Sequence, residues 1–203
     1  MTDLGTGPDG VERCSWATAA QELLAYHDGE WGQPLLDDNG LFEHLCLEAF
    51  QSGLSWLTVL RKRPAFREVF ADFQIEAVAQ FGDDDIARLL ADERIIRNRQ
   101  KITAAIENAR AARELIANGD SLSALIWSHR PEPTPAPRSY ADLPTSTPES
   151  AALAKELKRR GFCFIGPTTA YALMQACGLV NDHLEGCAIR ESATRAQTDA
   201  AKR

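Results

Sequence analysis

Apolar side chains recur every three or four residues along most of this chain, the spacing that places them on one face of an α-helix. Residues 37–53 show the pattern well. The apolar face of this segment consists of Phe42, Leu45, Cys46 and Ala49. The pattern predicts a helix from Leu41 to Ser52 that ends at Gly53, because glycine tolerates the left-handed conformation that closes a helix. Alternation of apolar and polar residues, which would indicate strands, does not extend over a useful length.

The same spacing predicts further helices. They cover residues 54–63 (stopping before Pro64), 83–92, 99–118, 148–160 and 167–177. Asn98 is placed to cap the long helix over residues 99–118, and Gly119 to end it. The helix near residue 148 has two candidate caps: Ser146 with Glu149, or Thr147 followed by proline at the first helical position. The predicted fold class is all-α, a bundle with short loops.

The remaining segments differ in composition. Residues 1–11 are glycine-rich and polar, and residues 188–203 carry few large apolar groups, so we expect a disordered N-terminal tail and a loose C-terminal tail. Residues 130–148 hold six of the ten prolines and predict an extended surface connector. One unit should therefore span residues 12–187. It has a helical core over about 37–130 and terminal segments over about 12–35 and 150–187.

Composition narrows the class of protein. Of the 203 residues, 44% are hydrophobic and 25% are charged, which is typical of a globular protein. No run is long and apolar enough for a membrane span, and the first ten residues do not resemble a secretory signal, so we expect a cytoplasmic protein without a membrane partner. The five cysteines are an odd number and argue against a disulfide framework. The net charge of −7 means that DNA binding would need a local basic surface.

Cysteine and histidine spacing predicts one metal site. His183 and Cys187 are four residues apart, and Cys14 and His27 form a second pair near the other end of the chain. Together they supply the four Cys and His ligands that zinc prefers. Four protein ligands leave no open position, so such a zinc would be structural and would fasten the two ends of the fold. His44 lies beside Glu43 on a predicted helix and is expected to face water.

Several segments together resemble the DNA-3-methyladenine glycosylase I family, which belongs to the helix-hairpin-helix superfamily of DNA repair enzymes. They are ERCSW (12–16), AYHDGEWG (25–32), CLEAFQSGLSW (46–56), IIRNRQKI (95–102), LPTSTPES (143–150) and MQACGLVNDHLEGC (174–187). The resemblance implies a helix-hairpin-helix glycosylase fold with one zinc bound by residues matching Cys14, His27, His183 and Cys187. It also implies a monomeric, monofunctional enzyme without lyase activity, which flips 3-methyladenine out of alkylated double-stranded DNA and hydrolyses its N-glycosidic bond.

The resemblance also assigns the base pocket. It places the base-recognising glutamate of the family at Glu48, which on helical spacing alone would be an ordinary solvent-facing residue. The matching segments also contain three aromatic candidates for stacking on a cationic purine: Trp16, Tyr26 and Trp56. Trp31 and Gln51 are weaker pocket candidates. We do not expect Asp182 to act as a base, since the family lacks a dedicated catalytic aspartate. Asp182 should cap or brace the metal turn instead.

The segment ERIIRNRQKI joins two predicted helices, as a helix-hairpin-helix element requires. It places Arg97, Arg99 and Lys101 at the start of the long helix, where cations are unfavourable unless an anion binds. We therefore predict DNA phosphate contacts there. Further basic islands lie at residues 60–67 and 158–160. Relative to the family pattern, Arg94 and Gln100 replace hairpin glycines, Leu23 replaces an aromatic residue near the pocket, and Ala49-Phe50 replaces a smaller, more polar pair. These departures bear on substrate range.

Two other functions compete with base excision. One is a non-catalytic DNA-binding protein that retains the fold and the zinc but has lost excision. The departures at Leu23 and Arg94 favour it, whereas Glu48, Tyr26 and Trp56 disfavour it. The other is a zinc hydrolase with Glu48 as its base, which would need an open position on the metal.

Overall fold

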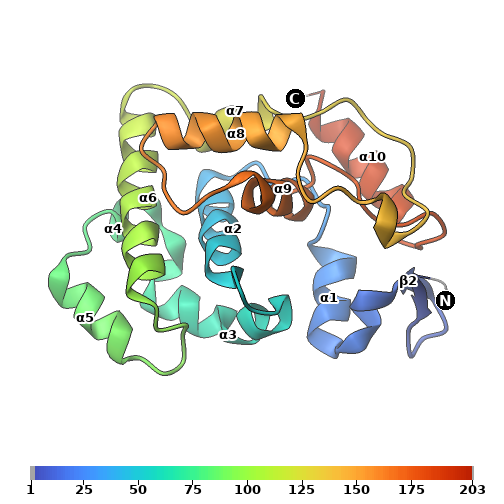
Figure 1. Ribbon diagram of the computed structural model, residues 1–203, viewed down its shortest axis with the longest axis horizontal. Coiled ribbons are helices and arrows are strands. Elements are labelled where there is room, and N and C mark those ends of the chain that lie inside the picture. Colours follow the sequence, from blue (N-terminus) through green and yellow to red (C-terminus); the bar gives the residue numbers. More distant parts are fainter. Residues whose placement is uncertain (1–2, 203) are drawn as a thin grey trace.

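The computed structural model describes residues 3–202, and its regular secondary structure is almost entirely helical (Figure 1). The strands are β1 (Leu4–Thr6) and β2 (Glu12–Cys14), and the short 3-10 helices are η1 (Ser15–Ala19), η2 (Ala71–Phe73) and η3 (Tyr140–Asp142). The first five α-helices are α1 (Gln21–Gly29), α2 (Asp38–Gln51), α3 (Trp56–Val69), α4 (Ile75–Val78) and α5 (Asp83–Ala91). The others are α6 (Arg99–Ala117), α7 (Leu122–Trp127), α8 (Pro148–Arg159), α9 (Pro167–Ala176) and α10 (Arg190–Ala200). No helix within residues 3–202 is both long and apolar enough to cross a bilayer.

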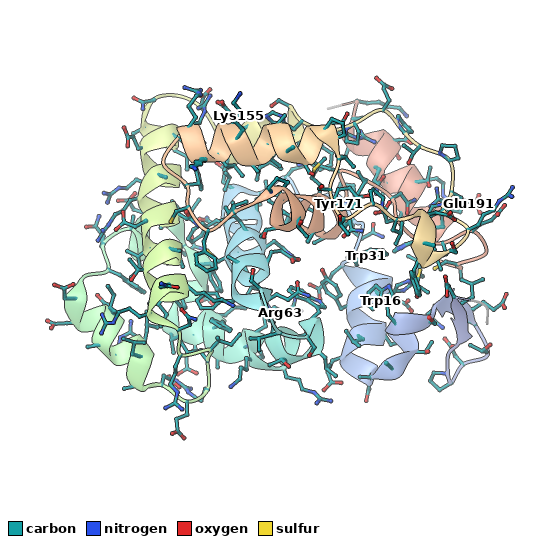
Figure 2. The ribbon with its side chains drawn as sticks, viewed as in Figure 1. Trp16, Trp31, Arg63, Lys155, Tyr171 and Glu191 are labelled. Carbon is teal, nitrogen blue, oxygen red and sulfur yellow. The ribbon has the colours of Figure 1, made fainter. Side chains whose placement is uncertain are left out.

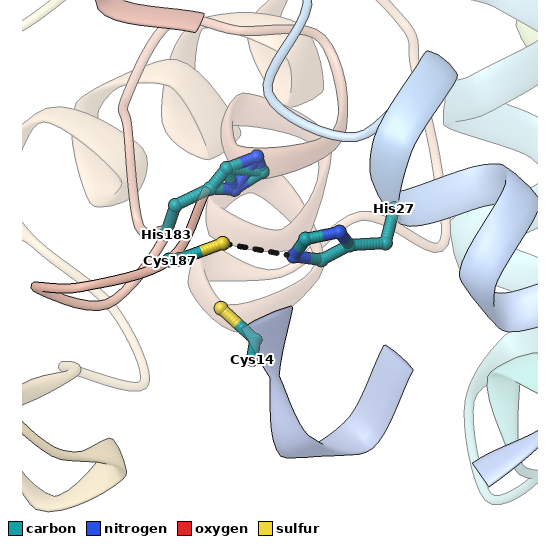
Figure 3. Close-up of side chains that lie close together, drawn as sticks. All are labelled: Cys14, His27, His183 and Cys187. Atoms are coloured by element: carbon teal, nitrogen blue, oxygen red, sulfur yellow. Dashed lines mark hydrogen bonds between the residues drawn. The ribbon is translucent and has the colours of Figure 1, made fainter. Parts of the chain in front are cut away.

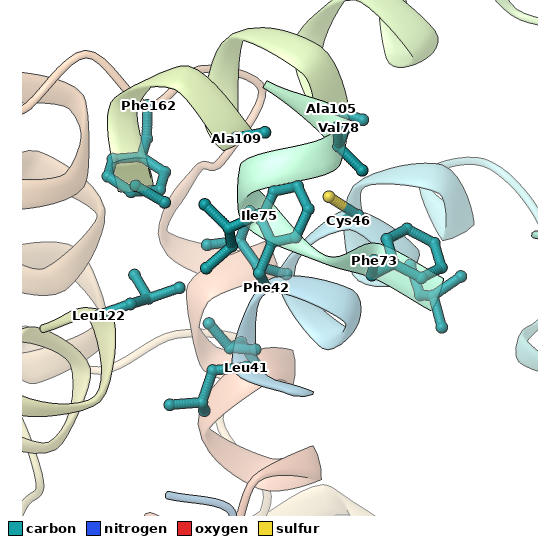
Figure 4. Packing of buried hydrophobic residues seen from close by; sticks show 14 of the residues in the cluster. Leu41, Phe42, Cys46, Phe73, Ile75, Val78, Ala105, Ala109, Leu122 and Phe162 are labelled. Atoms are coloured by element: carbon teal, nitrogen blue, oxygen red, sulfur yellow. The ribbon is translucent and has the colours of Figure 1, made fainter. Parts of the chain in front are cut away.

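Helix α2 lies at the centre of the core and contacts α3, α6, α7 and α9 (Figures 1 and 4). Every residue from Leu41 to Phe50 is buried. A helix enclosed in this way has no solvent face, so its polar residues are buried as well. Glu43, His44 and Glu48 are therefore withdrawn from bulk water, and the prediction that His44 faces water is wrong.

The predicted helix starts and stops are largely confirmed. Asn98 Oδ1 accepts a hydrogen bond from the N–H of Lys101 and so caps α6. Thr147 caps α8 through the N–H of Ser150, with proline at the first helical position, which decides between the two candidate caps. Gly178 follows α9 at φ +76°, and a Cβ there would lie 2.6 Å from the carbonyl carbon of Gln33. No side chain fits at this crossing of two segments.

Helix α3 does not stop before Pro64, as predicted, but continues to Val69. Proline removes one backbone hydrogen bond, at a cost of about 3 kcal/mol in a helix interior. The residues beyond it recover more through burial, because Phe66 is completely buried and its ring centroid lies 4.6 Å from that of Phe50. Tertiary packing outweighs the local preference here.

Both predicted tails are ordered within the described residues, so those two predictions are wrong; residues 1, 2 and 203 lie outside the description. At the N-terminus β1 pairs antiparallel with β2, and Arg13 forms ion pairs of 2.8 Å with both Asp9 and Asp28. At the C-terminus α10 buries Ala193 and Gln197, and Gln197 Nε2 donates to the carbonyls of Gly32 and Val180. Polar contacts order these segments despite their few apolar groups.

Candidate functional site

Four side chains from the two ends of the chain meet in a buried cluster (Figure 3). Cys14 ends β2, His27 lies in α1, and His183 and Cys187 belong to the turn that follows α9. Their ligand atoms all lie within 4.8 Å of one another. The predicted juxtaposition of the two pairs is therefore confirmed as geometry.

The chemistry of this cluster fits a metal ion such as zinc. Both ring nitrogens of His183 are buried and have no partner among residues 3–202, which is costly unless something binds them. Burial lowers the pKa of His183 to about 4, so its imidazole is neutral, as a metal ligand must be. His27 Nδ1 lies 2.8 Å from Asp28 Oδ1, leaving Nε2 directed at the cluster, 3.5 Å from Cys187 Sγ. A carboxylate behind a ligating histidine is a recurrent feature of zinc sites.

An aromatic pocket of about 260 Å³ opens beside this cluster. Its lining residues are Trp16, Tyr26, Trp31, Glu48, Gln51, Trp56, Tyr140, Leu143, Ala172 and Gln175. All the pocket residues predicted from sequence, the weaker candidates included, lie on this one cavity. The ring centroids of Trp16 and Trp31 lie 5.2 Å apart, and those of Tyr26 and Trp56 also lie 5.2 Å apart. Figure 2 labels Trp16 and Trp31 on the ribbon.

Glu48 is the one carboxyl group in the lining of this pocket and is only 6% exposed. Burial raises its pKa from 4.5 to about 8, because the ionised form loses its hydration. Desolvation also raises the pKa of Tyr26, whose side chain is buried in the same wall. The pocket thus holds a carboxyl group that is mostly neutral at pH 7 and would ionise beside a bound cation. A strongly perturbed group in an apolar cavity is a usual mark of a functional site.

The Cys/His cluster and the pocket share a wall. The ring centroid of Trp31 lies 4.7 Å from that of His183, and Trp16 meets His27 edge-on at 5.2 Å. Two pocket aromatics therefore rest on the imidazoles of the cluster. Fixing those imidazoles also fixes the shape of the pocket.

The predicted DNA contacts separate into two kinds. Arg97 and Arg99 are exposed at the start of α6, where Arg97 lies 3.4 Å from Glu93. Lys101 differs: it is 7% exposed, and its Nζ donates to the carbonyls of Phe50 and Ser52 at 2.8 and 2.6 Å. Its ammonium group satisfies the end of α2 beside the pocket, so the structure contradicts a phosphate contact by Lys101.

The other basic islands are largely neutralised by neighbouring carboxylates. Within residues 60–67 the ion pairs are Arg61 with Glu22, Arg63 with Glu30, and Arg67 with Glu43. In the second island, residues 158–160, Arg159 and Arg160 both pair with Glu156. These islands therefore present less positive surface than their sequence indicates.

The departures from the family pattern fall at different distances from the pocket. Arg94 pairs with Asp92 and Glu68 in the loop between α5 and α6, and Gln100 is exposed. Leu23 is buried in α1 and is not part of the pocket lining, and Phe50 belongs to the core.

Sequence reasoning missed four lining residues: Tyr140, Leu143, Ala172 and Gln175. The first two lie in the proline connector, which no periodicity relates to the pocket. Ala172 and Gln175 are three residues apart in α9, so helical spacing alone could have placed them on one face. Asp182 braces the turn that carries His183 and Cys187, because its carboxylate accepts hydrogen bonds from Tyr171 and Gln175 of α9 at 2.6 and 2.7 Å.

Comparisons with known proteins agree with this geometry. The model of the methyladenine glycosylase family matches residues 16–191. DNA-3-methyladenine glycosylase 1 of Escherichia coli is 48% identical over 180 residues, covering 87% of this chain and 96% of the relative. DNA-3-methyladenine glycosylase of Haemophilus influenzae is 43% identical over 183 residues, covering 89% and 98%.

Solved structures give the same result. A crystal structure of 3-methyladenine DNA glycosylase I aligns with a TM-score of 0.84 at 48% identity, covering 87% of this chain and 98% of that one. A structure from Staphylococcus aureus, described as the structural basis of 3-methyladenine recognition, aligns with a TM-score of 0.81 at 38% identity, covering 87% and 95%. The match extends over most of the chain and includes most of the pocket and the cluster, so the chain belongs to the methyladenine glycosylase family.

Proposed function

We propose that this protein is a DNA repair glycosylase that excises 3-methyladenine from alkylated double-stranded DNA by hydrolysing the N-glycosidic bond. The observation that carries the proposal is the buried Glu48 carboxyl group inside a cavity walled by three tryptophans and two tyrosines. In such a cavity, aromatic rings can stack on the faces of a planar base while the carboxyl group contacts its polar edge. A base reaches it only after flipping out of the duplex.

Charge supplies the selectivity. Methylation at N3 leaves the adenine ring of the nucleotide cationic, whereas undamaged adenine is neutral. A cation beside Glu48 favours the ionised carboxylate, and the indoles add a cation–π attraction of up to about 2 kcal/mol when water is excluded. Neutral adenine gains neither. Glu48 is therefore proposed as the catalytic, base-recognising residue, with Trp16, Tyr26, Trp56 and Gln51 as base-binding residues.

The charge of the damaged base also simplifies the chemistry. A cationic purine departs as a neutral base, so the reaction does not depend on a strong general acid. The sugar develops positive charge as the bond breaks, and an ionised carboxylate nearby stabilises it. Glu48 is the one pocket residue suited to both tasks.

The N-terminus of α6 supplies the proposed DNA contacts. Gln51 lines the pocket, and Lys101, near the start of α6, donates to the carbonyls of the two neighbours of Gln51, Phe50 and Ser52. The start of α6 therefore lies next to the pocket. Arg97 and Arg99 are exposed there. Backbone N–H groups at such a terminus bind phosphate, and the two guanidinium groups add local positive charge to an acidic protein. The helix pair α5–α6 is thus our candidate for the helix-hairpin-helix element.

We further propose one structural zinc per chain, bound by Cys14, His27, His183 and Cys187. The donor set and the orphaned nitrogens of His183 support it. When bound, the zinc would cross-link the two ends of the fold and hold no substrate, since four protein ligands complete its tetrahedron. A closed site leaves no position for a zinc hydrolase.

The pocket is complete within one chain, which supports action as a monomer. The bacterial repair enzymes named above support a cytoplasmic location at the chromosomal DNA.

A base-release assay tests the proposal. Methylated duplex DNA is incubated with the protein, and the freed bases are identified by chromatography. We expect 3-methyladenine to be released by the wild type, and far less by the Glu48→Gln variant. DNA binding without any release would instead establish the non-catalytic alternative, and undiminished release by Glu48→Gln would remove the role of Glu48.

A further inference from the structure

The proline connector contributes an aromatic wall to the base pocket. Tyr140 lies in η3, far along the chain from Trp16 and Trp31, yet it lines the same cavity. Its side chain is partly buried. The connector is therefore more than a link between the helical core and α8.

The hydroxyl group of Tyr140 bonds to the segment that carries Trp16. It accepts a hydrogen bond from the backbone N–H of Trp16 at 3.2 Å and shares a second bond of 3.0 Å with Ser15 Oγ. Trp16 is the second residue of η1, which has no side-chain cap of its own. Free N–H groups at a helix start need an outside partner, and Tyr140 supplies it.

Tyr140 is itself held in place from two sides. Its backbone N–H donates to Asp3 Oδ2 at 2.7 Å, and the backbone N–H of Ser15 donates to the carbonyl oxygen of Asp3 at 2.9 Å. On the other side, the N–H of Glu185 in the metal turn donates to the carbonyl oxygen of Pro137 at 2.8 Å. The N-terminal hairpin formed by β1 and β2, with Asp3 directly before it, and the turn that carries His183 and Cys187 thus fix the connector against the pocket.

The position of the Trp16 indole sets the spacing between the aromatic rings of the pocket. Its indole meets Trp31 edge-on at 5.2 Å and lies 6.5 Å from Tyr26, so a shift of its backbone would change the width available to a flat base. A ligand that must stack between aromatic rings binds more tightly when those rings are already ordered.

We propose that Tyr140 is a positioning residue of the base pocket, whose hydroxyl group anchors the backbone of Trp16 so that the indole stands at stacking distance from a flipped purine. The proposal rests on the base-excision function proposed above. It also gives the N-terminal hairpin a part in base recognition, because Asp3 holds Tyr140.

The test compares two single substitutions in the full-length protein. Tyr140→Phe keeps the ring and removes the hydroxyl group. The matched control is Thr18→Val, which removes another hydroxyl hydrogen bond of the same 3-10 helix, from Thr18 Oγ1 to the carbonyl of Ser15 at 2.9 Å, without touching the pocket. The measurements are the Kd of free 3-methyladenine from tryptophan fluorescence, the excision rate on methylated duplex, the affinity for undamaged duplex, and the thermal midpoint.

We expect Tyr140→Phe to raise the Kd of the free base about fivefold to tenfold, which lies within the range for losing one or two hydrogen bonds. Its affinity for undamaged duplex should be unchanged, and its thermal midpoint should match that of Thr18→Val, whose Kd stays at the wild-type value. The proposal is overturned if Tyr140→Phe binds the base as the wild type does, or if Thr18→Val weakens binding equally. A wild type that binds the free base but excises nothing would overturn the proposed function alone. A wild type that does not bind the base would overturn both.

Discussion

Replacing Glu48 with glutamine should stabilise the protein while sharply reducing its activity, and the stabilisation should depend on pH. The carboxyl group is 6% exposed, and burial raises its pKa from 4.5 to about 8. The folded protein therefore holds a proton that the unfolded chain releases above pH 4.5. Consequently, the contribution of Glu48 to stability is fully present below about pH 4.5 and is lost as the pH rises towards 8.

The size of this effect follows from the two pKa values. A tenfold change in proton affinity is worth about 1.4 kcal/mol, so the free energy of unfolding loses about 3 kcal/mol by pH 7 and about 5 kcal/mol above pH 8. Glutamine has the same shape and does not ionise. The Glu48→Gln variant should accordingly exceed the wild type by about 3 kcal/mol at pH 7, or roughly 6–12 °C in the thermal midpoint for a chain of this size.

The assay is urea unfolding of both proteins at pH 5, 7 and 8.5, together with the release of 3-methyladenine at pH 7. Taking the difference between the two proteins cancels every other titrating group. The stability difference should be about 1 kcal/mol at pH 5, about 3 kcal/mol at pH 7 and nearly 5 kcal/mol at pH 8.5. A difference that stays constant across this range, or one that favours the wild type at pH 8.5, would refute the burial of an ionisable Glu48 in the free protein.

Three further predictions concern the cluster, the DNA face and the C-terminus. His183→Ala should lose the metal and about 4–5 kcal/mol of stability, the entropy of a long cross-link; thermal melts with and without chelator measure it, and wild-type melts indifferent to chelator would contradict it. Arg99→Ala should reduce the steepness with which log K for DNA binding falls with log salt by about 0.9. Lys101→Met should leave that salt dependence unchanged and cost roughly 1–3 kcal/mol of stability. Equal salt dependence in the two variants would contradict the assignment of different roles to Arg99 and Lys101. Gln197→Ala should cost roughly 1–3 kcal/mol in urea unfolding, because it leaves one buried and one partly buried carbonyl unpaired. The exposed Gln80→Ala should cost no more than about 0.5 kcal/mol, and equal costs would argue against the docking of α10.

The resemblance to the family predicts that Glu48 lies in a base pocket, and Glu48 does line the aromatic cavity, but helical spacing alone assigns it to a solvent face. The difference arises because other helices enclose α2, so the polar side chains of α2 are buried along with the apolar ones. The same enclosure explains why the prediction for His44 was wrong. Burial raises the pKa of Glu48 and lowers that of His44 to about 4. Each shift disfavours the charged form, and neither can be calculated without the surrounding helices.

Lys101 illustrates a second limit of the sequence. A cluster of cations at a helix start predicts a bound anion, and for the exposed Arg99 this stays a prediction. For Lys101 the negative partner lies inside the protein. It consists of the backbone carbonyls of Phe50 and Ser52 at the end of α2, which the packing of α6 against α2 brings close to Lys101. Sequence shows that a cation needs a partner but not whether the protein or a ligand supplies it.

The sequence by itself determined most of the core helices, several of their caps and the pairing of the four cluster residues, because periodicity, capping chemistry and ligand spacing are local properties. The predicted base-pocket residues came from the resemblance to the family, and α1, α4, α7 and α10 were not predicted. The tertiary structure decided which polar groups lose their water, how the termini are ordered, and that Tyr140 in the proline connector joins the pocket. These outcomes depend on contacts between segments more than a hundred residues apart, such as Tyr140 with Trp16. The energy of such contacts comes from desolvation and from closing the chain on itself, which no local pattern records.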